Sequence, residues 1–377
     1  MPSLQPQTLS SCLHFTARIM CAKSPAVSFA WADRLRNLAT VMVIAIHVSG
    51  PLAEQLPDFN TWEWWTANWW DGVSRASVPI FVLLSGALLL TKDYPTMPFL
   101  KKRLSKVVLP GVFWMCIYMI YGHIAKADPA TIKDAGIKLL AGPVHYHLWF
   151  IYLIIGLYLM YPLLRPWVRQ ARDEDYWYVF VLAALGAWVA KILWVFWDLK
   201  VGIYWETFTN NVGYFVLGAY LMQKPFMDED PHPLLRPWPL PRRQMGWIAV
   251  TLAVVGSCIT VFGTYYASMW LKAGKFHNYF YDYLTPNAGM AIIGWFLTAK
   301  IYWNKSPLKA FEKEFAAASF GIYLVHVLVM DWWAQCGYWF GSAVSWKSVP
   351  IVVGLVAITS FVVVKFIKAL PGGENIT

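Results

Sequence analysis

The sequence predicts an all-α protein whose helices cross a membrane, and three observations support this prediction. Of its 377 residues, 58% are hydrophobic and only 14% are charged, which distinguishes the chain from soluble domains. Ten apolar segments approach the length of about 20 residues that a helix needs to cross the hydrocarbon core. The 23 Trp, 20 Tyr and 22 Phe suit a protein with many helix ends at the headgroup level.

The predicted spans follow from the apolar segments taken in chain order. The sixth and eighth are the weakest, because Asn210, Asn211, Pro286 and Asn287 make their starts more polar. The ten spans are residues 37–56, 74–91, 107–125, 147–164, 177–197, 209–223, 246–266, 284–302, 317–336 and 350–369.

The charge distribution sets the expected orientation. Most of the 31 Lys and Arg residues lie before the first span, after the last span or in the even-numbered loops, all on one side. By the positive-inside rule, both termini are expected in the cytoplasm of a bacterial inner membrane. The formal charge of +10 is therefore attributed to topology, with the lipid bilayer and not nucleic acid as partner.

The chain divides into three expected regions: a cytoplasmic leader over 1–30, a transmembrane domain over 31–370 and a short cytoplasmic tail over 371–377. The Pro-rich loop from Pro225 to Arg243 is expected to link two halves of the bundle. The five cysteines form no CxxC pair, so neither a metal site nor a disulfide framework is indicated. No permanently bound cofactor is expected, and a second copy of the chain stays open as a partner.

An unusual loop, Asp58 to Asp71, alternates Trp with polar and acidic residues. It is expected on the outer membrane surface. The Trp side chains could stack on sugar rings, but an interfacial aromatic belt is the favoured interpretation.

The first span carries the strongest candidate site. Arg36 and His47 are eleven residues apart, close to three helical turns, so they share one face about 16 Å apart along the axis. Histidine can take a proton from a hydroxyl near neutral pH. A buried structural histidine, and an ion pair of Arg36 with Asp33, are the alternatives.

Further candidates lie in the next two spans. Ser85 and Gly86, after Pro79, favour close approach of a neighbouring helix and a cavity beside His47, although ordinary helix packing explains them equally. Arg75, at the start of the same span, is another cavity candidate. At the start of span three, Lys102, Arg103 and Lys106 suit a phosphate-bearing ligand, or simple anchoring on the basic side.

Two more histidines mark short motifs. His147 and Trp149 lie in YHLWF at the start of span four, where a wet structural role is favoured for the histidine. His326 lies deep in span nine, within SFGIYLVH, and could line the same cavity as His47. Asp282 and Asp331 are acidic candidates with no geometric link to His47.

These motifs together resemble the acyltransferase-3 family, in this order: Arg36 with His47, SVPIF…LSG over Ser77–Gly86, YHLWF and S-x-GIY-x-x-H. The resemblance covers about residues 31–369 and is nearest to the stand-alone branch of enterobacterial common antigen and exopolysaccharide O-acetyltransferases. It implies a catalytic His47, supported by Arg36. It also implies a donor-binding Arg-x-x-Arg, represented here by Arg103 and Lys106; the lysine keeps the charge but loses bidentate geometry.

The resemblance implies transfer of an acyl group from cytosolic acyl-CoA to a hydroxyl of a cell-surface or exported glycan. Acetyl is the favoured acyl group. His47 would act as general base or as transient acyl carrier. The rival hypothesis is a transporter of a glycan or small anion, with His47, Arg36 and His326 as a proton relay. Transporters often show inverted repeats, and this sequence shows none.

Overall fold

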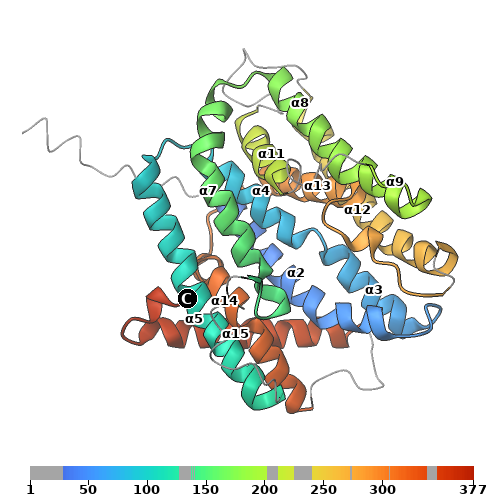
Figure 1. The fold of residues 1–377 in the computed structure, drawn as a ribbon, viewed down its shortest axis with the longest axis vertical. Coiled ribbons are helices and arrows are strands. Elements are labelled where there is room, and N and C mark those ends of the chain that lie inside the picture. Colours follow the sequence, from blue (N-terminus) through green and yellow to red (C-terminus); the bar gives the residue numbers. More distant parts are fainter. Residues whose placement is uncertain are drawn as a thin grey trace, which may run out of the picture.

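A computed structural model describes residues 29–126, 137, 139, 141–201, 211–224, 240–271, 274–304, 306–337 and 346–377. Within these residues the chain forms a bundle of helices (Figure 1). The predicted leader over 1–30 lies outside the described residues except for its last two, and the predicted linker Pro225–Arg243 is described only from Leu240 onward.

The predicted all-α membrane bundle is confirmed. Eight helical units in the described part of the chain are long and apolar enough to cross a membrane. The sixth and eighth predicted spans correspond to two shorter helices, α11 and α13, of 12 and 17 residues. The main helices are α2 (Ala30–Gln55), α3 (Trp62–Ser74), α4 (Ser77–Leu89), α5 (Thr96–Lys126), α7 (Trp149–Gln170), α8 (Asp173–Ala184), α9 (Ala190–Trp197), α11 (Val212–Gln223), α12 (Arg242–Tyr266), α13 (Pro286–Tyr302), α14 (Ala310–Gln335) and α15 (Ser348–Ala369).

The second span differs from its prediction. It runs over Trp62–Leu89 as two helical pieces, α3 and α4, so the predicted 74–91 covers only its second half. The Trp-rich segment is therefore helical from Trp62 to Ser74 and not an irregular loop. The Thr61 hydroxyl accepts a hydrogen bond from the backbone N–H of Trp64 and starts α3. Trp64 is fully buried and donates to the carbonyl of Ala53 in α2, so this segment belongs to the bundle.

Helix α2 occupies the middle of the bundle (Figure 1). It packs against α3, α4, α13, α14 and α15. Leu35, Ala39 and Val48 have no exposed surface, because helices cover several faces of α2. Side chains from α2 can therefore reach an interior space bordered by several other helices.

Small residues allow the closest helix crossings. A methyl group built on Gly86 in α4 would lie 1.7 Å from the carbonyl oxygen of Phe215 in α11. A methyl group on Gly218 in α11 would lie 2.0 Å from the carbonyl oxygen of Leu83. The two backbones are in contact here, as is common where membrane helices cannot rely on the hydrophobic effect to associate.

The unit formed by α8 and α9 marks the lipid-facing edge. Only 6% of its most apolar stretch is buried by other parts of the protein. The exposed side chains include Trp177, Tyr178, Trp194 and Trp197. A soluble protein would not leave such a surface uncovered, but lipid tails cover it in a membrane.

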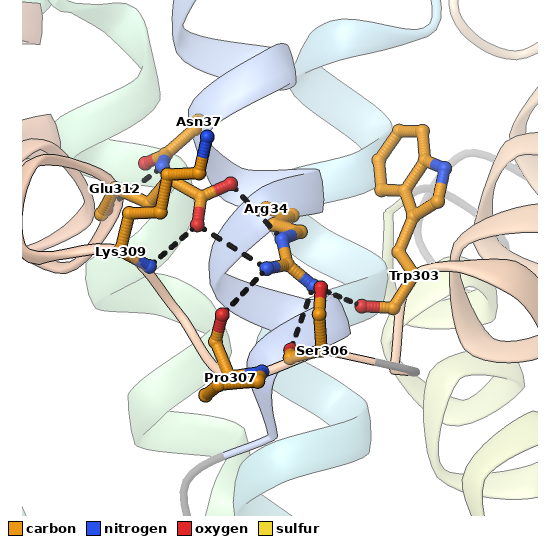
Figure 2. A network of polar contacts seen from close by, with 7 residues as sticks. All are labelled: Arg34, Asn37, Trp303, Ser306, Pro307, Lys309 and Glu312. Carbon is orange, nitrogen blue, oxygen red and sulfur yellow. Dashed lines mark hydrogen bonds and ion pairs between the residues drawn. The ribbon is translucent and has the colours of Figure 1, made fainter.

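Arg34 ties the first turn of α2 to the connection between α13 and α14 (Figure 2). Its guanidinium donates to both carboxylate oxygens of Glu312, at 3.0 and 3.2 Å. It also donates to three backbone carbonyls, those of Trp303, Ser306 and Pro307, at 2.5, 3.1 and 3.0 Å. Asn37 adds a hydrogen bond from its side-chain amide to the carbonyl of Glu312, at 2.8 Å. The planar fork of arginine is what allows one side chain to hold five acceptors.

We expect Gly86→Ala to destabilise the protein, because α4 and α11 would have to separate to admit the methyl group. The cost should be about 1–3 kcal/mol or more, seen as a lower midpoint of thermal unfolding in detergent. Gly156→Ala is the matched control, because Gly156 in α7 has no atom within 4 Å of the added methyl group. Equal midpoints for the two variants would contradict the tight crossing.

We expect Arg34→Ala to lower the unfolding midpoint more than Lys313→Ala, which removes an exposed cation from the same helix as Glu312. The loss would come mainly from the three backbone carbonyls that Arg34 holds, since solvent weakens its ion pair with Glu312. Arg34→Lys should recover only part of the loss, because an ammonium cannot reproduce the fork. Full recovery with lysine would show that charge alone matters at this position.

Candidate active site

A cavity of about 790 Å³ lies within the bundle and is lined by α2, α4, α5, α7 and α14. Arg36 and His47 both line it, so their predicted common face on α2 is the face that borders the cavity. Of the other sequence candidates, Ser85, Arg103, Lys106, His147, Trp149 and His326 also line it. One cavity therefore joins a basic end near Arg36 to a histidine end near His47.

Three histidine rings meet at the histidine end. The ring centroid of His47 lies 5.2 Å from that of His326 and 6.3 Å from that of His147. The His147 and His326 centroids are 5.3 Å apart. They come from three separate elements: α2, α14 and the short 3-10 turn Tyr146–Leu148 that precedes α7. Among the described residues, no group of side chains is arranged to hold a metal ion.

Hydrogen bonds assign the tautomer of His326. Its Nδ1 lies 2.7 Å from the carbonyl oxygen of Tyr323, which can only accept, so Nδ1 carries the proton. The Nε2 atom is then left with a free lone pair, and it is buried with no hydrogen-bond partner in the described part of the chain. The Nε2 of His147 is also buried and without a partner there. A fourth histidine joins the cluster, because His145 Nδ1 lies 2.9 Å from His147 Nδ1.

Two tyrosine hydroxyls hold α14 against its neighbours. The hydroxyl of Tyr323 in α14 donates to the carbonyl of His147 at 2.6 Å. The hydroxyl of Tyr118 in α5 donates to the carbonyl of Leu324 at 2.9 Å. The first bond fixes α14 against the turn that carries His147, and the second fixes α14 against α5. Sequence reasoning missed both tyrosines, although Tyr323 lies within the SFGIYLVH motif.

The basic end gathers cations from three helices: Arg36, Arg103 and Lys106, joined by Lys368 of α15. The side chain of Arg36 is paired with Asp33, so the sequence alternative of a local ion pair is confirmed even though the residue lines the cavity. The residues after α15 turn back to this end, and Glu374 supplies an acidic group among the cations. The indole N–H of Trp114 holds this turn by donating to the carbonyl of Ile376 at 2.8 Å.

Four sequence candidates are not part of the cavity lining. Lys102 is exposed on the outer side of α5, and Arg75 is paired with Asp71 at a distance of 2.6 Å. Asp71 is completely buried and was missed, because its segment was interpreted as an outer loop. The acidic candidates Asp282 and Asp331 contact Lys191 and Tyr121, respectively, and neither lines the cavity.

The comparison with protein families decides the class of the chain. A profile of the acyltransferase-3 family, described as an acyltransferase domain, matches residues 29–368. The chain belongs to the acyltransferase-3 family. No curated protein and no solved structure matches it significantly.

The family match and the candidate membrane spans together identify this acyltransferase-3 protein as a multi-pass membrane acyltransferase. The matched region contains the histidine cluster and all the helical cations of the basic end, and it stops before Glu374. The cavity of this acyltransferase thus has two chemically different ends within one family domain.

Proposed function

We propose that the chain is an O-acyltransferase that moves an acyl group from cytosolic acyl-CoA to a hydroxyl of a cell-surface or exported glycan. Acetyl is the favoured acyl group. The observation that carries the proposal is one cavity with cations at one end and a histidine cluster at the other. The ends are about three helical turns apart along α2, roughly 16 Å. This separation suits a donor whose phosphates and thioester are joined by a long flexible arm.

The cations of the basic end bind the phosphates of the donor, and Arg103 is the best placed to do so as a guanidinium fork. Lys106 and Lys368 add charge without fixed geometry. The basic end faces the cytoplasm in this proposal, in agreement with the bias of Lys and Arg toward one side of the chain. The protein would then lie in a bacterial inner membrane with both termini inside.

His47 carries the proton chemistry. Its imidazole takes the proton of the acceptor hydroxyl while that oxygen attacks the thioester carbonyl carbon. The tetrahedral intermediate collapses, the carbon–sulfur bond breaks, and the leaving thiolate takes the proton from the imidazolium. The products are an ester and free CoA, and no net proton is gained or lost. In the variant mechanism His47 first takes the acyl group itself and releases CoA, and the hydroxyl attacks the acyl-imidazole.

His326 assists as a positioning residue. Its protonated Nδ1 donates to the carbonyl oxygen of Tyr323, which leaves a lone pair on Nε2. The centroids of the His326 and His47 rings are 5.2 Å apart. A lone pair near the His47 ring stabilises the imidazolium that forms when His47 takes a proton. The centroid of the His147 ring lies 6.3 Å from that of His47.

We expect His47→Ala to reduce acyl transfer at least about 100-fold, the smallest usual effect of losing a general base. The measurement is transfer of label from radiolabelled acetyl-CoA to the cell's own glycans in membrane vesicles. His123→Ala is the matched control, because His123 is exposed on α5 and does not line the cavity.

Normal transfer by His47→Ala at normal expression would contradict both forms of the mechanism. No transfer by the wild type, with acetyl-CoA or with longer acyl-CoA donors, would instead favour the transporter hypothesis.

We expect Lys106→Ala and Glu374→Gln to change the KM for acyl-CoA in opposite directions. Removing the cation raises KM and removing the acid lowers it, by roughly two- to fivefold each, because exposed charges contribute about 1 kcal/mol or less. Both effects should shrink at high salt. Lys102→Ala, a neighbouring cation outside the cavity lining, should leave KM unchanged. A change with Lys102→Ala equal to that with Lys106→Ala would mean that only the net charge of the surface matters.

A further inference from the structure

Three aromatic side chains line the cavity in an unbroken row that crosses three helices. The ring of Phe81 in α4 lies 6.0 Å from the ring of Phe150 in α7, measured between centroids. The Phe150 ring lies 5.7 Å from the ring of Tyr323 in α14. All three side chains line the cavity and keep part of their surface exposed, so cavity space lies directly against the rings. The row therefore forms a continuous wall from α4 through α7 to α14.

Helices α2 and α14 run parallel and in register beside this wall. They start side by side, because Arg34 near the start of α2 bonds to Glu312 near the start of α14. His47 is about as far along α2 from Arg34 as His326 is along α14 from Glu312. The rings of these two histidines are 5.2 Å apart. Residues at equal distances from the two histidines therefore lie at the same depth.

Val43 and Tyr323 are such a pair. Val43 precedes His47 by about one helical turn, roughly 5 Å toward the basic end, and it also lines the cavity. Tyr323 precedes His326 by nearly the same distance. Helix α2 packs against both α4 and α14, which closes the circle of helices around the cavity at this depth. The four side chains, called the collar below, are Val43, Phe81, Phe150 and Tyr323.

The rings of the collar are fixed in place. The hydroxyl of Tyr323 donates to the carbonyl of His147 at 2.6 Å, so this ring cannot swing aside without losing the bond. Phe150 is held between the rings of Phe81 and Tyr323. Closely packed side chains admit extra methyl groups only at a cost in free energy. The collar is therefore a fixed apolar opening in the path toward His47.

A donor bound by its phosphates at the basic end enters this path with its acyl group in front. The acyl group has to pass the collar before the thioester reaches His47. The part of the CoA arm next to the thioester is unbranched, so an unbranched acyl group needs no more width than the arm itself. A branch on the carbon next to the carbonyl adds a methyl group across the path.

Acyl length is a separate property, because it depends on the space at the histidine end. Trp149 and Tyr283 both line the cavity, and Trp149 follows His147 by two residues. Their rings stack with centroids 5.9 Å apart and planes 20° apart. Tyr214 holds this stack by donating to the carbonyl of Tyr283 at 2.7 Å. Width at the collar can thus be tested apart from length.

We propose that the collar determines the specificity for the acyl donor by width. It admits unbranched acyl groups and rejects acyl groups that branch at the carbon next to the carbonyl. This proposal rests on the proposed function, because it requires an acyl-CoA that enters from the basic end. It adds the class of acyl group and the side chains that select it.

The test compares two isomeric donors, n-butyryl-CoA and isobutyryl-CoA, which have the same atoms and differ only in the branch. Each competes unlabelled against radiolabelled acetyl-CoA, with the purified full chain in detergent. The acceptor is the glycan fraction of the same cells after mild base has removed its O-acyl groups. The result is the ratio of the two inhibition constants, isobutyryl over n-butyryl. A change in overall activity cancels in this ratio.

We expect a ratio of at least about ten for the wild type, because the extra methyl group must be forced between fixed rings. Phe150→Ala should bring the ratio close to one by opening the collar. Phe81→Ala should do the same from another helix, and Phe150→Leu should give an intermediate value. Phe262→Ala is the matched control and should keep the wild-type ratio, because Phe262 is 45% exposed on α12 and does not line the cavity.

Three outcomes would overturn the proposal. Equal inhibition constants in the wild type would show that the path does not sort acyl groups by width. A wild-type ratio retained in both Phe81→Ala and Phe150→Ala would place the selection elsewhere. A ratio that falls equally in Phe262→Ala would reflect a general loosening of the bundle. Failure of the proposed function is separate, since the wild type would then transfer no label from acetyl-CoA to glycan.

Discussion

The five hydrogen bonds of Arg34 are the constraint on which the cavity depends. They attach the first turn of α2 to the start of α14, and these two helices carry His47 and His326. If α2 rotated or slid against α14, the 5.2 Å spacing of those rings would be lost. A membrane bundle lacks a hydrophobic force between its helices, so a polar anchor of this kind, together with close glycine contacts, has to fix the register.

The same logic explains how polar groups are distributed inside an apolar bundle. Hydrogen bonds from Tyr118 and Tyr323 go to backbone carbonyls and hold helices in place. Two buried nitrogens without a partner in the described part of the chain, His147 Nε2 and His326 Nε2, belong instead to residues that line the cavity next to His47. Leaving such groups unpaired costs about 1–3 kcal/mol each. Their concentration around His47 is what a site prepared to bind polar ligands requires.

Much of this arrangement could be predicted from the sequence, because it depends on helical periodicity within single segments. The eleven-residue spacing of Arg36 and His47 correctly predicted a shared face, and both line one cavity. Periodicity was not used to decide which of Lys102 and Arg103 faces the cavity. Around the axis of α5 the two side chains are about 100° apart, on opposite sides of Lys106. The basic cluster therefore appeared larger than the part that lines the cavity.

What the sequence could not supply was contact between distant segments. Asp71 was assigned to an outer loop because five Trp residues with acidic neighbours resemble an interfacial segment. Its burial depends on the packing of α3 against α2 and α12, which no local pattern encodes. Arg34 looked like one more cytoplasmic cation for the same reason, since its partners lie about 270 residues away along the chain.

The stack of Trp149 on Tyr283 also has a consequence for the membrane itself. A cavity that begins among cations and reaches the middle of a bundle is the start of a pore, and a continuous pore would collapse the ion gradients of the cell. The stacked rings place two broad apolar side chains in the cavity lining, and an apolar constriction is a poor path for a hydrated ion. We therefore expect the protein to keep the membrane closed to ions.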